Sequence, residues 1–300
     1  MATTLEQAKI SREAETAAKN SAARLSILAA AFLVTLKTIT GLLTGSISVW
    51  ASLLDSAMDI FASTINLIAV RAASRPADKE HAYGHGKAES LAGLFQSVVI
   101  AASGIYLIWE AAQRIVRPHQ TSYEWVGMAT MLIATATSVA LVVRLRRVAR
   151  QTESPALHAD ALHYVTDIYT NASALIALLI IRVSSWQIAD PLISILIAVY
   201  ILWSAVTVAR ESIDALMDRR LPPEVDEKIA EIVSRFRPLG VLGFHDLRTR
   251  RSGSQKFIDL HLEVERDQRL QEAHDNTVRV LRAIEAEIPR ARVHIHTDPK

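Results

Sequence analysis

The sequence predicts a membrane all-α bundle of six helices, followed by a small cytoplasmic α+β domain. Half of the 300 residues are hydrophobic, and they gather in long blocks within the first two-thirds of the chain. The last third is richly charged and shows the shorter periods of amphipathic helices and strands. The formal net charge is only +2, and the basic residues flank the apolar blocks rather than forming a stripe with aromatic residues. Nucleic acid is therefore not an expected partner, whereas a lipid bilayer is.

Six segments are long and apolar enough to cross a bilayer, which takes roughly 20 residues of α-helix. The chain accordingly divides into an N-terminal extension (1–21), a six-helix transmembrane domain (22–209) and a cytoplasmic domain (210–300). The polar N-terminal segment has no small-residue cleavage site after a short apolar core, so no signal peptide is predicted. The predicted spans are 22–45, 48–71, 89–113, 124–147, 159–183 and 187–209.

Basic residues are distributed unevenly over the predicted loops. Two loops, after the second and the fourth span, hold most of them, and the opposite loops are poorer in positive charge. The positive-inside rule therefore predicts a multi-pass protein of the inner (plasma) membrane with both termini in the cytoplasm. The residues in question are Arg71, Arg75, Lys79 and Lys87, and Arg144, Arg146, Arg147 and Arg150.

Two of the predicted spans carry pairs of metal-ligand side chains. Asp55 and Asp59 are four residues apart in the second span, and His163 and Asp167 are four apart in the fifth. Residues at this spacing share a helix face. Packing the two faces together gives three carboxylates and one imidazole around one point. With no cysteine in the chain, this is a thiolate-free set that suits tetrahedral zinc or a similar ion.

The alternative is that these carboxylates only pair with basic side chains inside the bundle. A carboxylate at the bilayer centre costs about 2.5–3.5 kcal/mol on insertion scales, so three of them need compensation. Lys37 is the only cation in the middle of a predicted span, and one lysine cannot neutralise three carboxylates. The two pairs on separate spans therefore favour a metal site. An enzyme is not expected, because the chain has no P-loop and no nucleophile motif.

The chain resembles the cation diffusion facilitator family, in particular its bacterial ferrous-iron and zinc efflux branch. The resemblance extends from the first span to Pro299. It implies that the Asp–Asp and His–Asp pairs form a transport site, which in this family is associated with zinc and cadmium. The segments that carry it are GSISVWASLLDSAMDI, PADKEHAYGHGKAESL, LHYVTDIYTN, ADPLISILIA and the terminal HIHTDP.

The loop after the second span offers a second group of ligands, Asp78, His81 and His85. A charged loop of this kind is by itself usually solvated, but the resemblance implies a metal site here. Glu80 is an alternative to Asp78 as its carboxylate.

The resemblance also implies a contact between subunits of a homodimer. Lys87 would pair with an acidic residue after the sixth span, matched by Asp218, and help to lock the subunits together. The alternative is that Lys87 only determines topology.

From about Leu221 the sequence predicts a small α+β domain. PPEVDEKIAEIVSRFR and RLQEAHDNTVRVLRAIEAEI have the pattern of amphipathic helices, and GFHDLRTR, QKFIDLHLEVE and RARVHIHTDP that of strands. The second strand alternates strictly, with its apolar residues on one face: Ile258, Leu260, Leu262 and Val264. The order helix, strand, strand, helix, strand fits helices on one face of a sheet. The resemblance implies the same order, in a ferredoxin-like domain.

The histidines of this domain fall on polar faces. His294, His296 and Asp298 share one side of the last strand. His294 departs from the family pattern, in which an apolar residue is usual, and we interpret it as facing solvent; His119 and His158 match no motif. The resemblance implies a cluster of two ions, bridged by the aspartate, and formed by His245, His261, His274, His296 and Asp298.

Together these observations predict a homodimeric exporter that exchanges cytoplasmic Zn2+ for protons by alternating access. Cd2+ or Fe2+ are further expected cargoes. Two alternatives stay open at this point. One is the same transporter with iron, manganese or cobalt as its physiological cargo, and the other is a membrane scaffold that senses metal without transporting it.

Overall fold

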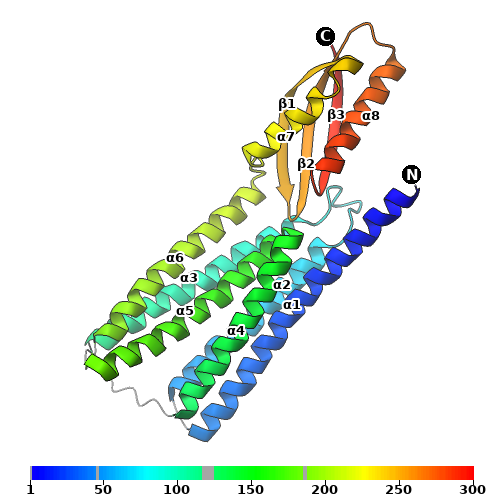
Figure 1. Ribbon diagram of the computed structural model, residues 1–300. Coiled ribbons are helices and arrows are strands. Elements are labelled where there is room, and N and C mark those ends of the chain that lie inside the picture. Colours follow the sequence, from blue (N-terminus) through cyan, green and yellow to red (C-terminus); the bar gives the residue numbers. More distant parts are fainter. Residues whose placement is uncertain (1, 45–46, 117–124, 185–187) are drawn as a thin grey trace. The chain divides into compact units, whose positions relative to one another are not determined.

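The computed structural model (Figure 1) describes the chain except residues 1, 45–46, 117–124 and 185–187. A few side chains within the helices are also outside the described set, that of Asp55 among them. The chain divides into two compact units, Met1–Ser212 and Ile213–Lys300. Each unit is described by itself below.

Six long helices form the first unit, and the last of them continues into the second unit. The shortest has 27 residues, which at 1.5 Å per residue is roughly 40 Å and exceeds the bilayer core. The expected extension 1–21 is continuous with the first span in one helix of 43 residues. The helices are α1 (Ala2–Thr44), α2 (Ile47–Ala73), α3 (Lys87–Val116), α4 (Trp125–Thr152), α5 (Pro155–Ser184) and α6 (Ala189–Leu216).

Four of these helices contain segments that are long and apolar enough to cross a membrane. They are Glu13–Leu43, Lys87–Val116, Met128–Thr152 and Pro191–Leu216. The other two, α2 and α5, carry the acidic residues singled out above, and part of each lies among the undescribed side chains.

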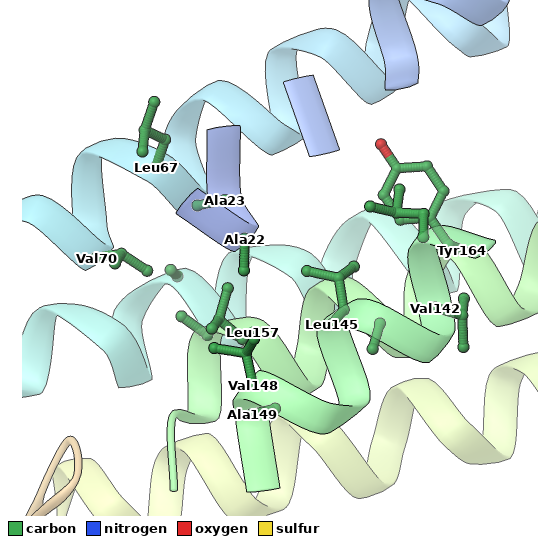
Figure 2. Packing of buried hydrophobic residues seen from close by; sticks show 14 of the residues in the cluster. Ala22, Ala23, Leu67, Val70, Val142, Leu145, Val148, Ala149, Leu157 and Tyr164 are labelled. Carbon is green, nitrogen blue, oxygen red and sulfur yellow. The ribbon is translucent and has the colours of Figure 1, made fainter. Parts of the chain in front are cut away.

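Small residues bring α1, α2, α4 and α5 close together. Figure 2 shows Ala22 and Ala23 of α1 in one buried cluster with Leu67 of α2, Leu145 of α4 and Leu157 of α5. Short side chains at helix crossings let the backbones approach, as is typical of membrane bundles.

A separate buried cluster of Ile100, Ile201 and Ala205 joins α3 to α6. Gly104 allows a close approach at this crossing, because a Cβ atom there would lie 3.0 Å from Leu202 Cδ2.

The second unit is an α+β domain, which confirms the predicted fold class. Its three strands lie in the order β1-β2-β3, with β1 antiparallel and β3 parallel to β2. Ile258, Leu260 and Leu262 on one face of β2 are buried in a core with residues of both helices. Its elements are α7 (Pro223–Ser234), η1 (Arg237–Leu239), β1 (Val241–Ser252), β2 (Gln255–Val264), α8 (Leu270–Glu287) and β3 (Ala291–Pro299).

Candidate metal sites

The helical unit contains one buried cluster of potential metal ligands, built from α2 and α5. One ligand atom each from Asp59, His163 and Asp167 lies within 4.8 Å of the other two. Nε2 of His163 is 2.8 Å from Oδ1 of Asp59, and the two residues are only 3% and 4% exposed. The structure thus brings together three of the four predicted residues. The side chain of the fourth, Asp55, lies outside the described residues, one helical turn before Asp59.

Hydrogen bonds to neighbouring helices fix the face of α5 that carries His163. Tyr164 donates to the carbonyl oxygen of Ser26 on α1 at 3.2 Å, and its hydroxyl lies 3.1 Å from Oγ of Ser63 on α2. The Thr166 hydroxyl donates to the His163 carbonyl at 2.6 Å. One turn before Asp59 on α2, Ser56 Oγ accepts a hydrogen bond from Lys37 of α1 at 2.7 Å.

The chemistry of this cluster suits a divalent cation. It offers carboxylate oxygens and an imidazole nitrogen in a setting from which water is largely excluded. Buried charges in such a setting are expected to be paired or to coordinate metal. The second ring nitrogen of His163, Nδ1, is buried and has no hydrogen-bond partner among the described residues.

Sequence reasoning missed one buried carboxylate next to this cluster. Asp160 is fully buried, and its Oδ2 accepts a 2.6 Å hydrogen bond from the hydroxyl of Ser26. The spacing could have identified this residue, because Asp160 lies three residues before His163 and seven before Asp167, on the same face of the helix.

A buried ion pair was missed as well. Lys19 and Glu89 lie 2.7 Å apart. The first falls within the expected extension and the second on the predicted boundary of a span.

The loop between α2 and α3 holds a second group, Asp78, His81 and His85. The Asp78 carboxylate lies 3.4 Å from Nδ1 of His81 and 3.3 Å from Nε2 of His85. The backbone amide of His81 donates to Asp78 at 2.7 Å and holds the pKa of this carboxyl below its usual value. Of the two acids left open by the sequence, Asp78 is the one that the structure brings to the histidines.

The expected Lys87–Asp218 contact between subunits stays a prediction. Lys87 is the first residue of α3, whereas Asp218 belongs to the second unit. Within that unit the Asp218 carboxylate lies 3.3 Å from Nη1 of Arg250.

The third group lies on the polar face of the three-stranded sheet. His245 pairs with His261 across β1 and β2, and His261 pairs with His296 across β2 and β3. Asp298 contacts all three imidazoles. Its Oδ2 lies 2.9 Å from His261 and 3.4 Å from His245, and its Oδ1 lies 3.2 Å from His296. The two carboxylate oxygens of Asp298 therefore face different imidazoles. A carboxylate arranged in this way can bridge two ions.

The electrostatics of this cluster favour an ionised carboxylate. The hydrogen bond with His261, followed by the nearby charges of the other imidazoles, lowers the pKa of Asp298. An ionised carboxylate beside imidazoles is a typical ligand set for zinc.

Of the remaining histidines, His294 lies on the same face of the sheet and lines a pocket with His261 and His296. His274 is exposed on α8, a helix that packs on the core face of the sheet, so a single chain does not bring it to Asp298. Its participation stays a prediction. His294 and His158 are exposed, and His119 lies outside the described residues.

Comparisons with known proteins agree with this reading of the chain. Residues 23–217 match the model of the cation efflux transmembrane domain, and residues 221–300 match that of the cation efflux protein cytoplasmic domain. The cation-efflux pump FieF of Klebsiella pneumoniae is 44% identical over 256 residues, which is 85% of this chain and 84% of that protein. The FieF pump of Serratia proteamaculans is 42% identical over 282 residues, 93% of this chain and 92% of its own.

A solved structure of CzrB in its Zn form is 35% identical and covers 28% of this chain and 93% of its own, with a TM-score of 0.26.

Buried carboxylates and an imidazole within a bundle of long apolar helices define an integral membrane protein that handles cations. The chain belongs to the cation diffusion facilitator family of cation efflux proteins. It is a transporter that exports divalent metal cations, and it is not an enzyme.

Proposed function

We propose that this protein is a zinc/proton antiporter of the inner membrane that moves Zn2+ out of the cytoplasm by alternating access. The proposal rests above all on one observation. Asp59, His163 and Asp167 offer three ligand atoms within 4.8 Å of one another, two of the three side chains being fully buried. Asp55 supplies the fourth ligand of this transport site.

Proton exchange follows from the chemistry of the ligands. Zinc binds a neutral imidazole and ionised carboxylates, so loading the site releases any protons that these groups hold. After the ion leaves on the outer side, His163 and the carboxylates take up protons there. The return of the carrier then brings protons inward and couples export to the proton gradient.

The identity of the cargo follows from the donor set. One imidazole and three carboxylates suit tetrahedral zinc, and cadmium is the next candidate. Ferrous iron, manganese and cobalt also accept nitrogen and oxygen donors, and affinity order alone does not fix selectivity. We therefore propose Zn2+ as the transported ion. Transport of another divalent ion is one of the outcomes of the test below.

The two other groups act from the cytoplasmic side, where we place both termini. Asp78, His81 and His85 bind an ion at the loop. His245, His261, His296 and Asp298 hold zinc on the sheet, joined in the dimer by His274. Bound metal there stabilises a homodimer, to which the Lys87–Asp218 pair contributes.

The test is zinc flux into proteoliposomes under an imposed proton gradient. We compare the unmodified protein with Asp59→Ala and with Glu110→Gln, a control on α3 whose carboxylate pairs with Arg114 at 2.7 Å. We expect flux that follows the gradient, disappears in Asp59→Ala and persists in the control. Flux with another divalent ion but not zinc would change the cargo, and no flux with any ion would favour the metal-sensing scaffold.

A further inference from the structure

Three helices of the membrane unit meet in a buried polar triad near the end at which α5 begins. Nζ of Lys19 on α1 lies 2.7 Å from Oε1 of Glu89 on α3. The hydroxyl of Ser154, just before α5, donates to Oε2 of the same carboxylate at 2.5 Å. The exposed fractions are 6% for Lys19 and 2% for each of the other two. One carboxylate oxygen of Glu89 therefore contacts Lys19, and the other accepts the hydrogen bond from Ser154.

The triad adds a polar contact between helices that also share apolar packing, because Ala92 of α3 lies in the large cluster of the bundle. Lys19 and Ser154 belong to segments of this cluster, and α3 shares a second cluster with α6. Replacing a buried ion pair by apolar residues is often neutral or stabilising, so stability alone does not account for such a pair. A switch is its best-attested use.

A second set of buried polar residues lies roughly 10 Å deeper, two helical turns from the triad. Ser26 follows Lys19 by seven residues, Gln96 follows Glu89 by seven, and Asp160 follows Ser154 by six. Seven residues return an α-helix to nearly the same face. On α1 and on α3 the two side chains therefore form one polar stripe, whereas Ser154 lies just before α5 and Asp160 within it. We call Ser26, Gln96 and Asp160, together with Asn66 of α2, the inner polar layer.

The inner polar layer lies between the triad and the metal cluster. Asp160 precedes His163 by one turn of α5, and Asn66 follows Asp59 by two turns of the opposite-running α2. Every member is at most 4% exposed. From the triad to His163 the distance along α5 is nine residues, or roughly 13 Å.

Gln96 Nε2 has no hydrogen-bond partner among the described residues, and the Asn66 side chain faces the Asp160 carboxylate without a hydrogen bond of good geometry. Buried polar atoms are nearly always paired, with protein or with ordered water. Buried polar groups gathered in one layer in this way are suited to water or to a passing ion. Ionisable side chains within a bundle commonly mark ion pathways.

We propose that Lys19, Glu89 and Ser154 form the closed cytoplasmic gate of this transporter, and that Ser26, Asn66, Gln96 and Asp160 line the passage from the gate to the metal cluster. The inference rests on the proposed function for the direction of transport. Opening the gate separates Glu89 on α3 from Lys19 and Ser154 and admits hydrated cations to the passage. Closing it restores the arrangement seen here.

The natural absence of cysteine allows a direct test by thiol labelling of the full chain. Asn66→Cys introduces one thiol into the passage. Its reaction with a membrane-impermeant, positively charged methanethiosulfonate is followed in inside-out and right-side-out vesicles. Glu89→Gln on this background removes the charge of the gate. Glu110→Gln, on the same helix and with its own arginine partner, is the matched control.

We expect Glu89→Gln to raise the labelling rate at least about tenfold in inside-out vesicles only, because one partner of a buried pair is removed. Ser154→Ala leaves the ion pair in place and is expected to give a smaller rise. The double change Lys19→Glu with Glu89→Lys is expected to restore slow labelling. Size-exclusion profiles in detergent identify variants that do not fold.

An unchanged rate in both Glu89→Gln and Ser154→Ala, or an equal rise in Glu110→Gln, overturns the gate. This readout needs no metal. Absence of zinc flux in the unmodified protein would contradict the proposed function instead, so the two failures are distinguishable.

Discussion

Nε2 of His163 on α5 and Oδ1 of Asp59 on α2 lie 2.8 Å apart in the interior of the membrane unit. Zinc binds imidazole nitrogen and carboxylate oxygen at about 2.0–2.2 Å each, so a tetrahedral ion bound to both atoms would hold them roughly 3.4 Å apart. We therefore expect the direct contact between the two side chains to be exchanged for bonds to metal when the site is loaded, and restored when the ion leaves.

Asp59→Asn keeps the size of the side chain but removes its charge, and is expected to abolish zinc flux. Zinc affinity should fall at least about tenfold, equivalent to about 1.4 kcal/mol, because one charged ligand is lost in a buried site. Flux in proteoliposomes and zinc titration of the purified protein measure the two effects. Wild-type flux in Asp59→Asn would exclude this residue as a ligand.

In the loop between α2 and α3, Asp78→Asn is expected to weaken zinc binding, whereas Glu80→Gln is not. Only Asp78 contacts the imidazoles of His81 and His85, at 3.4 and 3.3 Å. The two substituted positions lie two residues apart in the same loop. Zinc titrations of the two variants therefore form a matched comparison. Equal losses in both would mean that the general charge of the loop, and not a ligand, attracts the ion.

Zinc affinity of the sheet cluster is expected to fall as the pH drops, because protons compete with the ion for its ligands. Protonated imidazole cannot bind the ion. The lowered pKa of Asp298 keeps its carboxylate ionised at neutral and mildly acidic pH, so this carboxylate does not contribute to the slope there. Asp298→Asn should therefore weaken binding at every pH and leave the slope unchanged. A slope that disappears in this variant would assign the titration to the aspartate.

Ion pairs between α7 and α8 predict acid sensitivity of the second unit. Lys228 and Arg235 lower the pKa of Glu231, and Arg235 and Lys228 lower that of Glu287. A carboxylate with a lowered pKa contributes stability above its unfolded pKa and loses it as the pH falls through the folded value. Hydrogen exchange of α7 and α8 should therefore accelerate below the ordinary glutamate range of about 4.3.

The matched variants for this effect are Glu287→Gln and Glu227→Gln. We expect the first to reduce the acid sensitivity of the two helices and the second to leave it unchanged, because Glu287 contacts Arg235 at 2.5 Å and Glu227 is merely exposed. Identical profiles for both variants would contradict the assignment.

Adjacent positions of β2 are expected to differ sharply in their contribution to stability. Leu260→Ala removes a side chain that is 1% exposed and should cost about 2–5 kcal/mol. Asp259→Ala, on the exposed face, should stay within about 0.5 kcal/mol. Hydrogen exchange of the sheet in the full chain measures both. Similar costs at the two positions would contradict the inward and outward assignment.

Periodicity predicted most of the fold. The alternation from Ile258 to Val264 matches the burial of β2, although Phe257 before it is also buried, and Ile229, Ile232 and Val233 of α7 are buried as expected. The ends of the membrane helices could not be predicted as well, because hydropathy detects only the apolar part of a helix. The first helix begins at Ala2, some 20 residues before the predicted span, since its polar turns continue the same backbone geometry.

Spacing within single helices predicted the residues of the candidate metal cluster. It could not predict contacts between residues that are far apart in the sequence. Asp160 and Ser26 are 134 positions apart, and Lys19 and Glu89 are 70 apart. Such pairs depend on which helix faces meet, and a single sequence does not specify that. His274 is a case in which the family resemblance predicted a contact that a single chain does not make. The residue lies on α8, which packs on the core face of the sheet.

The single strand β2 alternates residues of the hydrophobic core with polar residues, and His261, a proposed metal ligand, lies between Leu260 and Leu262. One residue inserted within it would exchange the two faces of the strand and remove both features in a single event. Over evolutionary time β2 can therefore accept substitutions on either face almost independently, but not a change of length by one. The neighbouring β1 already contains irregularities between His245 and Arg248, and bulges of this kind absorb an extra residue. Insertions and deletions in related sequences should accordingly collect in β1 and spare β2.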